Sequence, residues 1–317
     1  MSDPIVNDPT VWPPSTGQEP PTPAAALTTT DARRTAGYVL LAYAAFNLLL
    51  PLAPLPAHRP PPLVLEGLLL LTTAAFMLLQ LWLARAVVAL RPRPLACAGL
   101  AVLCAALWAL DFWALGHARA LHLPLFVLQL ALGLSITLGC TFLGILLSRI
   151  IREVNVLLPV ALVAMPIDYL GAMTPIGFTQ NAVAQHPGMV QALSVPVPTA
   201  GGAHHHGGLH PIGFIGPGDI LFMAFFFAVV LRLDLNVRGT FWWMYGLLTA
   251  TLLLVLVTGI NVAALIPMGL AVLIANFRHF KLKREEVFAT VYAALLVVAL
   301  AAGFYAYSHA HFFRHSS

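Results

Sequence analysis

The fold of this chain is decided by residues 211–233, which read PIGFIGPGDILFMAFFFAVVLRL. From Asp219 to Arg232 every intervening residue is uncharged, and most are large and apolar. Asp168 lies in similar surroundings, within VALVAMPIDYL at residues 160–170. An ionisable side chain at membrane depth costs about 2.5 kcal/mol or more, so it is a functional-site hypothesis by default. The sequence therefore predicts a pair of aspartates suited to acid–base chemistry in a bilayer.

The composition predicts an all-α polytopic membrane protein. Of the 317 residues, 60% are hydrophobic and only 9% are charged, which lies outside the range of ordinary soluble domains. The formal net charge is +4, but Lys and Arg are scattered singly or in pairs between apolar segments. This pattern indicates membrane topology and not a nucleic-acid surface. Cys97, Cys104 and Cys140 fall within apolar runs, so small core residues are favoured over a disulfide framework.

Nine segments are long and apolar enough to be transmembrane helices, given that roughly 20 residues cross the hydrocarbon layer. The division between the seventh and eighth segments rests on Gly259 alone. The predicted segments are about 35–57, 63–90, 95–116, 122–148, 154–176, 211–233, 240–258, 260–277 and 287–310.

Basic residues predict the orientation of these nine segments. One side of the membrane receives only Arg59, Arg119 and Arg314. By the positive-inside rule the more basic side is cytoplasmic, so we expect a multi-pass protein of a bacterial inner membrane, with its N-terminus inside and its C-terminus outside. The thirteen basic residues on the expected cytoplasmic side are Arg33, Arg34, Arg85, Arg91, Arg93, Arg149, Arg152, Arg232, Arg238, Arg278, Lys281, Lys283 and Arg284.

The chain divides into four expected regions. Residues 1–34 are rich in Pro, Thr, Asp and Ala and predict a disordered cytoplasmic tail. Residues 35–153 form an N-terminal four-helix membrane region. Residues 154–310 carry both membrane aspartates, with an outward-facing loop at 177–210, and residues 311–317 form a C-terminal tail.

The loop at 177–210 lacks Lys and Arg but contains several histidines. A flexible loop is the favoured interpretation. Metal binding is the weaker alternative, because neither a His-Glu-x-x-His helix nor a Cys-x-x-Cys pair accompanies the histidines. They are His186, His204, His205, His206 and His210.

Helix geometry places the two aspartates at similar heights. Asp168 follows Arg152 by sixteen residues on an outward-running helix, and a rise of 1.5 Å per residue puts it ~24 Å from the cytoplasmic edge. Asp219 precedes Arg232 by thirteen residues on a returning helix, at ~20 Å from that edge. Gly216-Pro217-Gly218 predicts that this helix begins at or just before Asp219, after looser chain. Backbone exposed there could pair with an extended peptide.

At these residues the chain resembles the presenilin and signal peptide peptidase family of intramembrane aspartyl proteases. Gly216-Pro217-Gly218-Asp219 resembles the family's Gly-x-Gly-Asp helix, and Leu231-Arg232-Leu233-Asp234 resembles the way that helix ends in signal peptide peptidases. Asp168 lies on the preceding helix, as the first aspartate does in the family, although here Tyr169 follows the aspartate and does not precede it. Val195-Pro196-Val197-Pro198 resembles the proline stretch before the second aspartate. Ile266-Pro267-Met268-Gly269-Leu270 stands where the family has Pro-Ala-Leu.

The resemblance covers roughly residues 154–277 and implies a presenilin-like helix bundle. Asp168 and Asp219 would be the catalytic pair, needing no metal or other cofactor. Partners would be the lipid bilayer and transmembrane peptides. The expected outward position of the loop between the two Asp helices is similar to that in signal peptide peptidases, and it implies substrates with cytoplasmic N-termini. The substrate groove would be shaped by Tyr169, Gly216, Pro217, Gly218, Pro267, Met268, Gly269 and Leu270.

Other interpretations remain open. A proton- or ion-coupled transporter also places acids and broken helices at membrane depth, and an inactive homologue could serve as a binding scaffold. Both acids could instead only hydrogen-bond a neighbouring helix. That structural role is favoured for Glu66 and Asp111, near the outer ends of their helices, and we expect Asn276 at an interface near a helix end. A prepilin-type peptidase is disfavoured because Ile220 and not a basic residue follows Gly-x-Gly-Asp.

Overall fold

A computed structural model describes residues 29–53, 61–117, 125–173, 192–198, 214–258 and 262–280, together with six single positions between 288 and 303. Within these residues the chain is mostly helical. The α-helices are α1 (Thr29–Leu49), α2 (Pro62–Ala89), α3 (Pro94–Gly116), α5 (Leu125–Leu147), α6 (Val154–Met173), α9 (Pro217–Arg232), α10 (Val237–Thr258) and α11 (Leu265–Asn276). Two 3₁₀ turns, η1 (Ser148–Ile150) and η3 (Phe277–His279), follow α5 and α11, and the strands are β1 (Val195–Pro196) and β2 (Phe214–Ile215).

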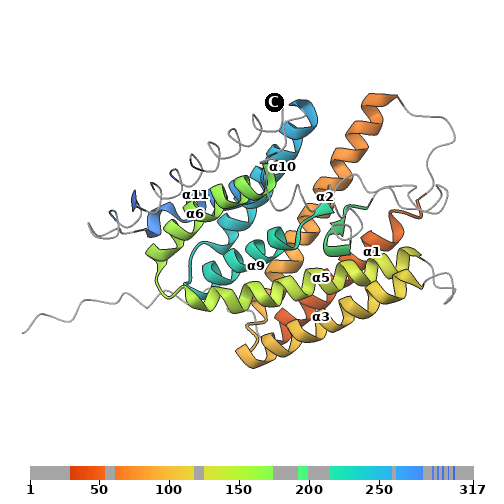
Figure 1. The fold of residues 1–317 in the computed structure, drawn as a ribbon, viewed down its shortest axis with the longest axis horizontal. Helices are drawn as coiled ribbons and strands as arrows, with labels where there is room; N and C mark the ends of the chain where they lie inside the picture. The colour runs from red at the N-terminus through yellow and green to blue at the C-terminus, as the bar shows by residue number, and fades with distance from the viewer. Residues whose placement is uncertain are drawn as a thin grey trace, which may run out of the picture.

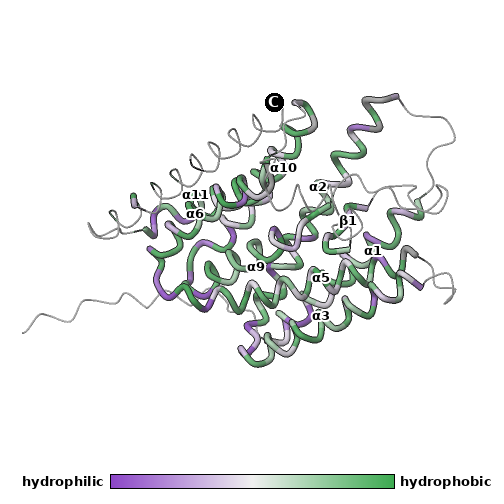
Figure 2. The backbone as a smooth tube through the Cα atoms, in the orientation of Figure 1, coloured by the Kyte–Doolittle hydropathy of each residue, from purple (hydrophilic) through white to green (hydrophobic). Residues whose placement is uncertain are grey.

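Four of the described helices are long and apolar enough to cross a membrane: α2, α3, α5 and α6. Helix α3 leaves large apolar side chains such as Val102 (70% exposed) and Leu110 (58%) outside the protein core. Exposed apolar surface on this scale suits contact with lipid. Figure 2 shows hydrophobic residues along α3 and α5 and hydrophilic residues at the turns that follow α2 and α5. The chain is therefore an all-α, membrane-embedded protein.

The described helices fall in eight of the nine predicted segments, but several bounds differ. Helix α1 begins at Thr29, so the predicted N-terminal tail is helical at its end, where Asp31 in the first turn favours a helix N-terminus. The same helix ends at Leu49 because Pro51 follows, and a proline disfavours helical backbone in the residue before it. The ninth predicted segment, 287–310, lies almost entirely outside the described residues.

The two predicted segments around the Gly-Pro-Gly-Asp and Pro-Met-Gly motifs are only partly helical. Helix α9 has 16 residues and α11 has 12, lengths of about 24 Å and 18 Å at 1.5 Å per residue. Neither spans a hydrocarbon layer of about 30 Å by itself. Extended backbone at Phe214–Ile215 precedes α9, where Gly216 and Pro217 start the helix late.

Helix α9 lies at the centre of the described bundle (Figure 1). Most of its residues between Ile220 and Val230 are buried, including Phe225, Phe226 and Phe227. Helices α5 and α2 pack along it, and α10 and α11 also touch it; α3 packs outside α5, α1 packs on α2, and α6 packs on α11. The helix that carries Asp219 is therefore the most enclosed element around the site.

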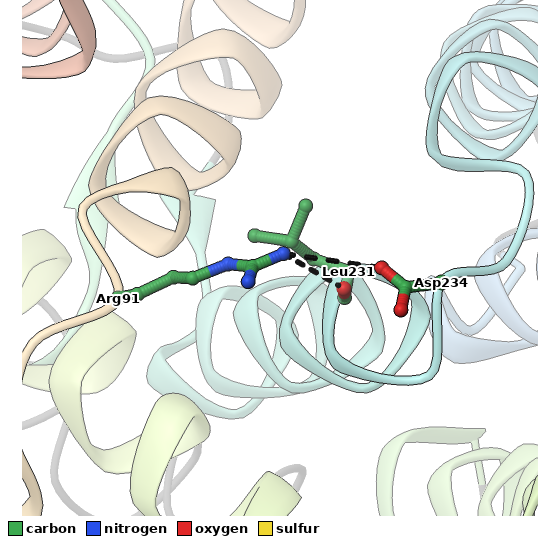
Figure 3. A network of polar contacts seen from close by, with 3 residues as sticks. All are labelled: Arg91, Leu231 and Asp234. Carbon is green, nitrogen blue, oxygen red and sulfur yellow. Dashed lines mark hydrogen bonds and ion pairs between the residues drawn. The ribbon is translucent and has the colours of Figure 1, made fainter. Parts of the chain in front are cut away.

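Polar contacts tie several helix ends together on one side of the bundle. Arg91, in the turn between α2 and α3, donates to the Leu231 carbonyl (3.5 Å) and faces the Asp234 carboxylate (4.0 Å; Figure 3). Arg149, after α5, donates to the Pro92 carbonyl (3.1 Å). These basic residues all come from the group predicted to lie on the cytoplasmic side.

Candidate active site

Asp219 occupies the third position of α9. Pro217 starts this helix with its fixed φ and without an N–H that would need a partner. The Gly216 N–H lies before the first turn and has no carbonyl partner within the helix; it donates instead to Asp219 Oδ2 at 3.3 Å. A carboxylate in this position is stabilised by the positive end of the helix dipole. The prediction that the helix begins just before Asp219 is confirmed.

Asp168 lies near the end of α6 and is held by a different helix start. Its Oδ2 accepts a hydrogen bond from the Leu265 N–H at 3.0 Å. Leu265 is the first residue of α11, so this carboxyl caps a helix that comes nearly a hundred residues later in the chain. Pro166, two residues before Asp168, has no N–H to bond the Leu162 carbonyl, which loosens α6 at this point.

The structure brings the two aspartates into one neighbourhood. Both side chains are half-buried, and the two helix starts at which they are held, those of α9 and α11, belong to helices that contact one another. Among the described residues, hydrogen bonds reach only Oδ2 of each carboxyl. Two carboxyls presented in this way can exchange protons with a molecule placed between them.

A short antiparallel ladder leads directly into the Asp219 helix. Val195 pairs with Ile215, and Pro196 pairs with Phe214. The ladder is anchored on the N-terminal helices, since Trp108 Nε1 of α3 donates to the Ala192 carbonyl (2.9 Å) and β1 packs on α5. Among the described residues the ladder has only these two strands, so the outer edge of each strand has no partner strand there. Extended backbone thus stands one residue before Gly216.

The three residues before Asp219 differ in how much space surrounds them. A Cβ at Gly216 would lie 3.4 Å from Asp219 Oδ2, whereas one at Gly218 would meet no atom within 4 Å. Pro217 and Gly218 are exposed. A side chain at position 216 would therefore be in van der Waals contact with the carboxyl, whereas one at position 218 would begin in open space.

The remaining predicted site residues divide into exposed and buried groups. Tyr169 is 49% exposed and Leu270 is 42% exposed, so both have surface to offer a ligand. Pro267, Met268 and Gly269 are buried where α11 packs on α6. Their direct effect is on the packing of α11 against α6, which sets where Leu265 meets Asp168.

Two other membrane acids lie apart from this pair. Asp111 on α3 accepts a hydrogen bond from Ser135 on α5 through its Oδ2 (3.0 Å), which confirms its predicted structural role. Glu66 is exposed on α2. Within the described residues, no three His, Cys, Asp or Glu side chains gather as metal ligands. The predicted histidine cluster lies outside the described residues.

Sequence reasoning missed two features of this region. The bond from Leu265 to Asp168 has no signal in the sequence, because it depends on where α11 starts in space. Asn276 lies at the end of α11, as expected, but its full burial and its partners were not predicted: it donates to Thr240 Oγ1 and accepts from the Asn236 N–H (both 2.9 Å). The signal in the sequence was a single amide at the end of an otherwise apolar segment. Its burial results from the packing of α10 on α11.

Comparison with known proteins gives no match: no family model, no curated protein and no solved structure aligns significantly with this chain.

Proposed function

We propose that this protein is an intramembrane aspartyl protease that hydrolyses peptide bonds within transmembrane segments, with Asp168 and Asp219 as its catalytic pair. One observation supports the proposal: two carboxyls from apolar segments lie on neighbouring helices, and each accepts a hydrogen bond from a backbone N–H at a helix start. Nine transmembrane crossings with a cytoplasmic N-terminus are part of the same proposal. The sequence resemblance to presenilins and signal peptide peptidases supports it independently.

The proposed reaction uses both carboxyls and one water molecule. Two carboxyls that share one site do not both ionise readily, so in the proposed reaction the pair holds one proton. The ionised partner takes a proton from the water as its oxygen attacks the scissile carbonyl carbon, and the protonated partner donates to the carbonyl oxygen. Collapse of the resulting diol breaks the C–N bond, and a proton passes to the leaving nitrogen. The products are a carboxylic acid and an amine, and no covalent enzyme intermediate forms.

Substrate presentation would use the extended backbone before Asp219. A helical substrate hides its carbonyl carbons, so it must unwind before water attacks. An unwound segment can add as a strand to an open sheet edge, where main-chain hydrogen bonds hold it. Strand β2 (Phe214–Ile215) offers such an edge next to the pair, and the open space at Gly218 lets a second backbone approach the carboxyls closely. This arrangement supports cleavage at the residue that lies beside Gly218.

The proposed substrate class follows from the basic-residue count. That count puts the connection between α6 and α9 outside the membrane on the non-cytoplasmic side. By resemblance to signal peptide peptidases, this orientation suits segments whose N-termini face the cytoplasm. Remnant signal peptides and type II membrane segments fit that requirement.

Replacement of either aspartate tests the proposal. In detergent or in proteoliposomes, Asp168→Asn and Asp219→Asn should each abolish cleavage of a labelled transmembrane peptide, by at least about a thousandfold if acid–base exchange is lost. The amide oxygen of Asn still accepts the Leu265 or Gly216 N–H, so both variants should fold. Product masses would identify the cleaved bond.

Asp111→Asn is the matched control, because Asp111 is also a membrane acid with a single interhelical partner. It should keep near-normal cleavage. Cleavage retained in either dyad variant would contradict the proposal. Proton-dependent solute flux in vesicles that requires Asp168 and Asp219, without any peptide cleavage, would instead identify a carrier.

A further inference from the structure

A groove lies far from the aspartate pair, between the start of α1, the end of α2, the end of α9 and the start of α10. Its volume is about 880 Å³, near the upper end of the roughly 300–1,000 Å³ typical of small-molecule sites. The wall is largely apolar, and its described residues include two arginines but no Asp or Glu. The residues used below are Leu78, Trp82, Arg85, Arg238, Phe241 and Trp242.

Both arginines line this groove, Arg85 from α2 and Arg238 from α10. Arg85 is half-buried, and its guanidinium carbon lies 5.4 Å from the centre of the Phe241 ring. Arg238 is close enough for its positive charge to repel that of Arg85. A cation–π contact holds the first guanidinium but does not neutralise it. An anion between the two arginines would relieve the repulsion and satisfy the fork-shaped donors of both.

The surroundings of the arginines fit the membrane surface. Trp82 (45% exposed) and Trp242 (54% exposed) border the groove, and Trp is enriched where hydrocarbon meets water. Arg238 lies in the first turn of α10, whose backbone dipole adds positive potential at that end. The groove also belongs to the basic side of the bundle, where Arg91 and Arg149 lie.

We propose that this groove binds one anionic phospholipid, with its phosphate between Arg85 and Arg238 and an acyl chain along Leu78 and the apolar wall. Charge selects the headgroup, and the apolar lining selects a ligand with a tail over a free anion. Such a lipid would bridge α2 and α10, and through Phe227 and Leu231 it would also contact α9. The inference does not depend on the proposed protease activity.

Tryptophan quenching by brominated lipids tests this site on the full-length protein. In phosphatidylcholine vesicles, brominated phosphatidylglycerol should quench Trp82 and Trp242 at a mole fraction several-fold lower than brominated phosphatidylcholine does. Arg238→Gln changes an exposed residue and should weaken this preference roughly fivefold, the size expected for one basic side chain near an anionic surface. Arg85→Gln should weaken it at least as much, in preparations whose thermal unfolding is unchanged.

Arg93→Gln is the matched control, since Arg93 is an exposed arginine on the same side of the bundle but does not line the groove. It should retain the preference. Equal quenching by the two brominated lipids, or an equal loss in all three arginine variants, would overturn the proposal and leave only general surface attraction. Loss of the preference in millimolar inorganic phosphate would also overturn it, because the site would then take a free anion.

Discussion

At the scale of single residues, Asn276 shows how a polar group fixes helices in an apolar bundle. Its side chain donates to Thr240 Oγ1 and to the Val272 carbonyl and accepts the Asn236 N–H, each at 2.9 Å. The Asn236 side chain caps the start of α10 through the Gly239 N–H (2.8 Å). One amide therefore joins the end of α11 to the start of α10, and α11 in turn carries the Leu265 N–H that holds Asp168.

Asn276→Leu should destabilise the protein by roughly 1–3 kcal/mol, because it leaves the Asn236 N–H without its acceptor and removes the hydrogen bond that the Thr240 hydroxyl accepts inside the bundle. Denaturation in mixed micelles would measure the loss. Thr240→Val should cost less, and the double variant should cost less than the sum, since both changes remove the same bond. Strictly additive losses would show that the two side chains do not act together.

At the scale of elements, close helix approach sets the position of both aspartates. A Cβ at Gly144 of α5 would lie 2.5 Å from the Leu221 carbonyl oxygen and 2.9 Å from the Phe225 nitrogen, both backbone atoms of α9. A Cβ at Gly269 of α11 would lie 2.9 Å from Met165 Cγ on α6. Backbone cannot move aside as a flexible methionine side chain can, so Gly144 is the stricter requirement.

Gly144→Ala should push α9 away from α5, costing about 1–3 kcal/mol as overpacking does. It should also lower peptide cleavage, because Leu221 is two residues beyond Asp219. Gly246→Ala is the control: position 246 of α10 has open space around it, and replacing a helical Gly by Ala favours the helix by up to about 1 kcal/mol. Thermal unfolding and cleavage rates of both variants would separate overpacking against α9 from the general effect of replacing a helical glycine by alanine. An undisturbed Gly144→Ala protein would contradict this account of the α5–α9 contact.

At the scale of the whole molecule, the arrangement of the helix ends agrees with the charge pattern. Contacts involving Arg91, Arg149 and Asn236 join the end of α2, the end of α5 and the start of α10 on one side. The ladder of β1 and β2 and the bond from Trp108 to Ala192 lie toward the other. Which of these two sides faces the cytoplasm is inferred from the distribution of basic residues alone.

Cysteine labelling tests that direction. In a variant without the native cysteines, Arg93→Cys and His117→Cys place single thiols at the two exposed ends of α3, about 35 Å apart at 1.5 Å per residue. A membrane-impermeant maleimide should label position 93 only in inside-out vesicles and position 117 only in right-side-out vesicles. The reverse pattern would invert the proposed substrate orientation.

Sequence reasoning located the start of α9 and placed both aspartates in apolar segments, whereas their proposed catalytic role stays a prediction. Gly216 and Pro217 locate the start of α9 because their backbone preferences are local. Asp168 and Asp219 could be matched in height because helix rise is constant. The predicted membrane segments 211–233 and 260–277 are longer than the helices α9 and α11 that they contain, because an apolar run does not by itself distinguish extended backbone from helix.

The sequence by itself determined that this is a helical membrane protein, that two aspartates lie inside its apolar segments, and where the second of their helices begins. These properties depend on composition and on interactions between residues close in the chain. Only the tertiary structure decided that Asp168 caps α11, that Asn276 is buried, and that Arg85 and Arg238 share a groove. Each of these contacts joins residues 36 or more positions apart, and their geometry depends on how whole helices pack.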